Sequence, residues 1–246
     1  MSKVIPHNWE VPQIFRGRLG THAGRQRVMS ADGHLLIILH EVPKPDAPER
    51  TARLYWRKPD GSWKATGSGA TNIAALRAHV DDFQAAVDKL EARAEKATRA
   101  SEWFELMHET APLLRTVRGL AATLQEAREL AKDDSALIAV RDSGQDIERA
   151  VELIHNHARA GLDFTIAKGA EDNAKSNKHI IESGHRLNLI AATFLPITAL
   201  GSLFGMQLEH GLEKWEAPYV FWAVAAIAFL LGFVVRASLP KAQPDL

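Results

Sequence analysis

Apolar residues follow different spacings in successive parts of the chain. A run at 34–42, HLLIILHEV, is strongly apolar and is typical of a buried β-strand. From about residue 72 onward, apolar residues recur at steps of three and four, which predicts long helices. Toward the C-terminus, segments 187–206 and 217–237 are uncharged until Arg236. The pattern predicts an α+β membrane protein with a small N-terminal head, long stalk helices and two C-terminal transmembrane helices.

Residues 1–71 are predicted to form a small cytoplasmic α/β head that contains β-strands. Asp60 and Gly61 stand between the aromatic-bearing segments RLYWRKP and SWKA, and this pair favours a hairpin because it tolerates positive φ. Basic residues outnumber acidic ones in the head. This surplus fits either a position near anionic lipid or an ordinary solvated surface.

Residues 72–134 are predicted to form a cytoplasmic helical hairpin. An apolar stripe from Ile73 to Leu90 recurs at helical spacing. Pro112 is expected to end or kink this first helix, because proline lacks the backbone N–H of a helix interior. A second helix is then predicted over 113–132.

A long stalk helix is predicted over 135–206, beginning at a turn formed by Asp133, Asp134 and Ser135. About seventy residues would make a rod of ~105 Å that continues into the first apolar segment. Glycines within it favour bends. The stretch 168–178, KGAEDNAKSNK, has almost no large apolar residue, which fits either a wet vestibule or a solvated helical turn.

Residues 187–206 and 217–237 are each long enough for a transmembrane helix. Twenty residues at ~1.5 Å per residue reach ~30 Å, the thickness of a hydrocarbon core. Tyr219 and Trp222 suit a membrane–water interface. The alternative is a pair of buried helices in a soluble domain.

Flanking charges predict the orientation of these two helices. The connection 207–216 is mostly acidic, whereas basic residues precede the first helix and follow the second. By the positive-inside rule the loop faces out, and the N-terminal part and the tail 238–246 are cytoplasmic, as in a multi-pass inner-membrane protein. A two-helix hairpin cannot enclose water alone, so a pore requires an oligomer.

Composition narrows the chemistry. Thirty basic residues balance thirty acidic ones, so net charge gives no sign of nucleic-acid binding. There are no cysteines, which excludes disulfides, thiolate zinc sites and iron–sulfur clusters. The histidine pairs 155/157 and 179/185 are spaced poorly for chelation, although His185 could act as a proton or zinc sensor in an oligomer. No motif indicates an enzyme.

The segment from Phe194 to Gln207, FLPITALGSLFGMQ, resembles the end of the first span in the CorA divalent-metal transporter family. Its proline, threonine and glycine-methionine fall at the family's offsets. The segment from Val140 to Ile154 resembles the Arg-Asp start of the family's stalk helix, and Ser176-Asn177-Lys178 resembles its end. The resemblance covers about 135–235.

The resemblance implies a homopentamer in the lipid bilayer that passes hydrated divalent cations such as Mg²⁺, Zn²⁺ or Co²⁺, with no tightly bound cofactor. Gly205, Met206 and Gln207 would form the outer mouth. Gln207 stands where the family has asparagine, and its added methylene predicts altered selectivity. Asp142 and Asp146 match the region where a regulatory metal binds.

One stripe of the first span is predicted to line the pore. Its members recur at steps of four, four, three, four and three: Leu187, Ala191, Leu195, Thr198, Ser202 and Gly205. Leucine rings can gate by dewetting and hydroxyl rings can face hydrated ions; alternatively, the hydroxyls bond their own backbone. The loop carboxylates that would attract cations are Glu209, Glu213 and Glu216.

These features predict a CorA-like oligomeric channel or transporter for cations, with divalent metal ions as the expected cargo. An alternative is a membrane-anchored oligomeric signalling or scaffold protein without transport. Its motivation is the short head and the presence of Ile180 or Ile181 where the family has an inner-pore asparagine. A further alternative is an effector pore that opens when the head binds a ligand.

Overall fold

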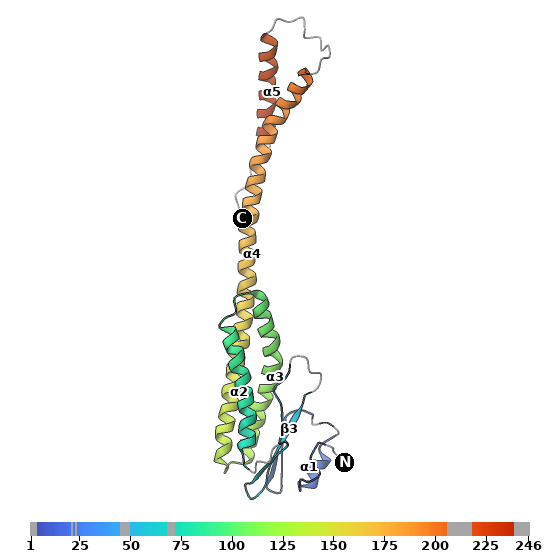
Figure 1. The fold of residues 1–246 in the computed structure, drawn as a ribbon, viewed down its shortest axis with the longest axis vertical. Coiled ribbons are helices and arrows are strands. Elements are labelled where there is room, and N and C mark those ends of the chain that lie inside the picture. Colours follow the sequence, from blue (N-terminus) through green and yellow to red (C-terminus); the bar gives the residue numbers. More distant parts are fainter. Residues whose placement is uncertain are drawn as a thin grey trace. The chain divides into compact units, whose positions relative to one another are not determined.

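A computed structural model describes residues 4–20, 22, 24–44, 50–67, 72–205 and 218–238, apart from the side chains of Phe204, Arg236 and Ser238. These residues form a small antiparallel sheet followed by long helices (Figure 1). The chain divides into two compact units, Met1–Ala167 and Lys168–Leu246. Each unit is described by itself.

The sheet of the first unit is a four-stranded antiparallel meander in the order β1-β2-β3-β4. The strands are β1 (Arg27–Ala31), β2 (His34–His40), β3 (Ala52–Arg57) and β4 (Trp63–Ala65). The strand predicted within 34–42 is confirmed over His34–His40, and the hairpin at Asp60-Gly61 is confirmed, with Gly61 at φ +80°. The structure adds β1, which the pattern of apolar residues did not predict.

Both faces of the sheet are covered. Leu35, Ile37 and Leu39 of β2 belong to the core formed with the long helices. The alternate residues Leu36 and Ile38 belong to a second core formed with the N-terminal segment 4–20, including α1 (Gln13–Gly17). Burial on both faces explains why β2 is a continuous apolar run instead of an alternating one.

The helices of the first unit are α2 (Ala74–Ala94), α3 (Ala100–Leu130) and the beginning of α4 (Ser135–Gly205). The prediction that a helix ends at Pro112 is wrong: Pro112 lies inside α3, and the break between helices falls between Ala94 and Ala100. Glu102 explains the new start, since its carboxylate accepts bonds from the N–H groups of Thr98 at 2.9 Å and Arg99 at 3.0 Å.

Specific contacts fix the sheet and α4 within this unit. Arg57 of β3 donates from Nε to Asp134 at 2.8 Å, and both side chains are largely buried. Asp134 also accepts a bond from the N–H of Ala136 at 3.2 Å, in the first turn of α4. One carboxylate therefore caps α4 and joins it to the sheet.

Candidate pore-lining face

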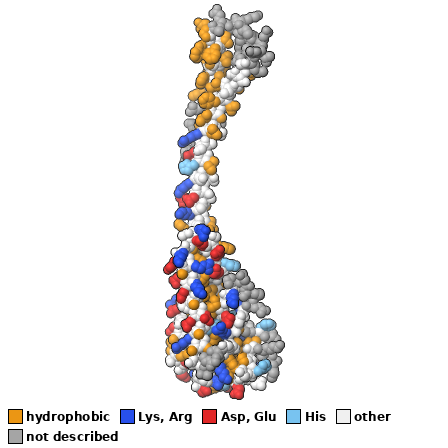
Figure 2. Space-filling model, viewed as in Figure 1, with side chains coloured by type: hydrophobic (Ala, Val, Ile, Leu, Met, Phe, Trp, Pro, Cys, Tyr) orange, Lys and Arg blue, Asp and Glu red, His pale blue; other side chains and the backbone are white. Residues whose placement is uncertain are grey.

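The second unit contains the C-terminal part of α4 and α5 (Tyr219–Ser238). Within the described residues, α4 is the helix long and apolar enough to cross a membrane, and Tyr219–Val235 is a shorter apolar helix. Figure 2 shows hydrophobic side chains gathered over both, while charged side chains lie earlier along α4. Leu187, Leu195 and Phe229 are each more than three-fifths exposed. Such a surface suits lipid or other subunits better than water.

The two apolar helices approach each other closely at one point. A Cβ atom placed on Gly232 would lie 2.9 Å from the backbone oxygen of Thr193. Ala228, one turn earlier on α5, is only 3% exposed. Small residues four apart let helix backbones meet, which is the usual device for packing helices inside membranes. The contact therefore defines which face of α4 points toward α5.

The predicted pore stripe lies on the opposite side of α4. At 3.6 residues per turn, the stripe residues fall about 120° to 200° around the helix from Thr193. Leu189, Pro196 and Leu200, on the side of Thr193, are partly buried. By contrast, Leu195, Thr198 and Ser202 are exposed. Contact with α5 therefore leaves most of the stripe open.

The hydroxyls of this segment bond their own helix, as the sequence-based alternative allowed. Thr198 Oγ1 lies 3.0 Å from the backbone oxygens of both Phe194 and Leu195. Thr193 Oγ1 donates to the oxygen of Leu189 at 2.8 Å. Donation uses only the hydroxyl hydrogen, so the oxygen lone pairs can still accept a bond from a hydrated ion.

Of the three residues predicted to form the outer mouth, the structure describes only Gly205. Gly205 ends α4. Met206, Gln207, Glu209, Glu213 and Glu216 lie outside the described residues. Their assignments to the mouth and the cation-attracting loop stay predictions.

Asp142 and Asp146 lie on α4 in the first unit, and neighbouring arginines hold both carboxylates. Asp142 is 2.9 Å from Arg141 Nε, and Asp146 is 3.6 Å from Arg149 Nη1. Among the described residues, no group of three histidine or carboxylate side chains could hold a metal ion. The assignment of a regulatory metal to these aspartates stays a prediction.

The histidine side chains whose contacts the structure shows serve mainly in packing. His155 Nδ1 lies 2.8 Å from the hydroxyl of the buried Thr110, and the ring of His157 lies 5.2 Å from that of Trp103. His185 falls about 80° outside the stripe by helical geometry. The stripe itself therefore offers hydroxyl oxygens and apolar groups instead of imidazoles.

No protein-family model and no curated protein matches the chain. Two solved structures are similar to it in fold. The full-length CmaX protein shares 15% sequence identity at a TM-score of 0.49, covering 87% of this chain and 78% of CmaX. The CorA magnesium transporter from Methanocaldococcus jannaschii shares 13% sequence identity at a TM-score of 0.39. This match covers 89% of this chain and 80% of the transporter chain. The candidate pore-lining face rests on this chain's own residues, and its role stays a prediction.

Proposed function

We propose that this chain is one subunit of a CorA-like homo-oligomeric membrane channel or transporter for cations. The observation that carries the proposal is the position of the stripe opposite the contact between Thr193 and Gly232. Symmetric copies of α4 would turn this stripe toward a common axis and leave α5 outside. In this arrangement α4 and α5 are the two spans of an inner-membrane protein whose termini are cytoplasmic.

The side chains of the stripe suit cations that pass without losing their hydration water. Thr198 and Ser202 carry uncharged oxygens, and repetition around an axis would make them rings. Mg²⁺ gives up its water reluctantly, so neutral oxygens that bind the hydrate suit it. Gln207 would supply a further amide ring at the outer mouth, with a selectivity altered by its longer side chain. Divalent ions, Mg²⁺, Zn²⁺ or Co²⁺, are the proposed cargo.

The leucine side chains in the inner half of the stripe are suited to form a gate. Leu187 and Leu195 project apolar side chains that are 67% and 65% exposed in the single chain. Rings of leucine around a narrow axis exclude water and stop ions until the ring widens. We therefore assign the gate to these leucines and ion contact to Thr198 and Ser202.

Ion flux into proteoliposomes of the purified chain tests the function, with Mg²⁺, Zn²⁺, Co²⁺, K⁺ and Cl⁻ measured in parallel. We expect uptake of divalent cations and no Cl⁻ flux. Ser202→Trp should lower uptake about tenfold, because bulk on the stripe closes the path. Leu203→Trp is the matched control, since Leu203 is exposed outside the stripe. Gln207→Asn should change the order of preference among the divalent ions.

The outcomes separate the proposed functions. Equal loss of uptake in Ser202→Trp and Leu203→Trp would contradict the assignment of the stripe. An absence of flux for every ion, from inserted and folded oligomers, would favour the scaffold. In that case Leu195→Asp should also leave the membrane leak unchanged.

A further inference from the structure

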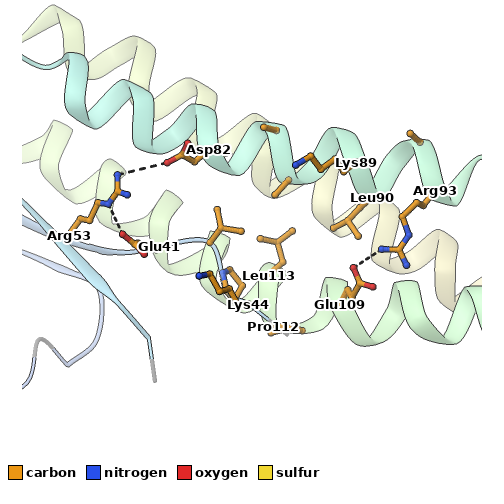
Figure 3. A pocket seen from close by; sticks show the side chains of 15 residues that line it. Glu41, Lys44, Arg53, Asp82, Lys89, Leu90, Arg93, Glu109, Pro112 and Leu113 are labelled. Atoms are coloured by element: carbon orange, nitrogen blue, oxygen red, sulfur yellow. Dashed lines mark hydrogen bonds and ion pairs between the residues drawn. The ribbon is translucent and has the colours of Figure 1, made fainter. Parts of the chain in front are cut away.

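A groove in the first unit lies between the segment after β2, the start of β3, and helices α2 and α3 (Figure 3). Its volume is about 880 Å³, within the range of pockets that bind small molecules. Ala85, Ala86 and Ala92 of α2 line it, and these small side chains leave the space unfilled. The transport function proposed above uses none of the groove residues.

Ion pairs occupy the carboxylates at both ends of the groove. Arg53 Nε donates to Glu41 at 2.7 Å and its guanidinium lies 3.9 Å from Asp82. Arg93 donates to Glu109 at 2.7 Å. These hydrogen bonds raise the pKa of both arginines. Because each lining carboxylate already faces an arginine, the groove is poorly suited to a metal cation.

Two lysines that line the groove are not paired with these carboxylates. Lys44 comes from the segment after β2 and Lys89 from α2, so they reach the groove from different elements (Figure 3). Both residues are exposed, and neither has an ion pair or hydrogen bond with any residue that the structure describes. The buried side chains of Leu90 and Leu113 form apolar lining in the same groove.

We propose that this groove binds a small soluble molecule with a phosphate or carboxylate group beside an apolar ring or chain. The anionic group pairs with the ammonium groups of Lys44 and Lys89. The apolar part lies against Leu90 and Leu113, where it leaves water. This binding site is independent of the pore, so it exists whether or not the chain transports ions.

Calorimetric titration of the full chain in detergent tests the site, with empty micelles as the blank. Three probes separate the contributions: phenyl phosphate has both features, inorganic phosphate is the anion alone, and benzamide is a neutral ring. We expect phenyl phosphate to bind about tenfold more tightly than either partial probe, because only it uses lysines and leucines together. Added salt should weaken its binding, since the lysines are exposed.

Variants assign the binding to the groove. The double substitution Lys44→Ala with Lys89→Ala should weaken phenyl phosphate binding about tenfold. Lys132→Ala removes an exposed lysine outside the groove and should change nothing. Ala86→Leu fills the groove while keeping both charges, and should also weaken binding.

Two results would overturn this assignment. The first is an absence of phenyl phosphate binding to the unmodified chain at millimolar concentration. The second is equal binding by the double lysine variant, with circular dichroism showing that it is folded. Benzamide binding as tightly as phenyl phosphate would likewise exclude a role for the lysines. None of these readouts depends on ion flux.

Discussion

His79 of α2 is a titratable side chain in the core of the first unit. It is 1% exposed, and its ring lies 5.6 Å from that of Tyr55 and 5.4 Å from that of Phe83. Burial, and then the nearby charge of Arg53, lowers its pKa to about 4. Its Nε2 has no hydrogen-bond partner among the described residues. The folded chain therefore holds the neutral imidazole, with Asp82 and Glu41 exerting a smaller opposing effect.

This lowered pKa predicts that the first unit loses stability in mild acid. Between pH 6.5 and 4 the unfolded chain binds the proton more readily than the folded chain, so the free energy of unfolding falls as the pH falls. The full effect of His79 would reach about 3 kcal/mol. Thermal unfolding followed by tryptophan fluorescence from pH 7.5 to 5 measures the part of this loss that falls above pH 5.

His79→Phe is the matched variant for this pH dependence, because phenylalanine fills a similar space between Tyr55 and Phe83. As the pH falls, the midpoint temperature of thermal unfolding should decrease less steeply for this variant than for the unmodified chain. A smaller slope should persist, since burial also lowers the pKa of His40. Equal slopes in the two proteins would assign the acid sensitivity to other groups.

At the scale of elements, α3 and α4 pack at a distance set by glycine. A Cβ atom placed on Gly161 would lie 2.6 Å from the indole ring of Trp103, closer than any ordinary contact. Trp103 is 7% exposed and cannot move into solvent without leaving the core. The glycine thus allows the first turns of α3 to meet α4.

Gly161→Ala should destabilise the first unit by about 1–3 kcal/mol, because overpacking outweighs the better helix propensity of alanine. Gly169→Ala is the control in the same helix, since a Cβ there meets nothing within 4 Å. It should leave stability unchanged or raise it by up to about 1 kcal/mol. Urea unfolding of both variants measures the difference. If both variants proved equally stable, Gly161 would have no packing role.

Local patterns predicted much of the fold because they depend on nearby residues. The hairpin at Asp60-Gly61 and the start of α4 at Ser135 follow from turn and cap chemistry. The predicted helix end near Pro112 was wrong because tertiary packing on both sides of Pro112 outweighs the cost of one missing hydrogen bond. The cover of residues 4–20 over the sheet could not be predicted, since its apolar residues show no regular spacing.

The two candidate sites also differ in whether their residues are close together in the sequence. The pore stripe lies on one helix, so its spacing could be found in the sequence. The structure added the contact between Thr193 and Gly232, which places α5 on the opposite face. The groove with Lys44 and Lys89 is built from segments far apart in the chain, and no local pattern marks it.

At the scale of the whole molecule, exposed apolar residues argue for assembly. They occur in both units: Leu153 and Phe164 of the first unit are each 69% exposed, and the stripe of the second unit is open. A single helical hairpin cannot surround a water-filled path, so ion passage would require several copies. A closed ring would give each copy the same environment and direct one face of α4 toward the axis.

Single cysteines can test this arrangement because the chain has none of its own. Ser202→Cys places a thiol on the stripe, and Leu203→Cys places one about 100° away around α4. If the stripe faces the axis, oxidation in membranes should link Ser202→Cys chains into dimers at least about tenfold more readily, because disulfides form only over short Cα separations. Non-reducing gel electrophoresis measures the linked fraction. Preferential linking of Leu203→Cys would instead place a different face of α4 between the subunits, and the pore would have to be lined by that face.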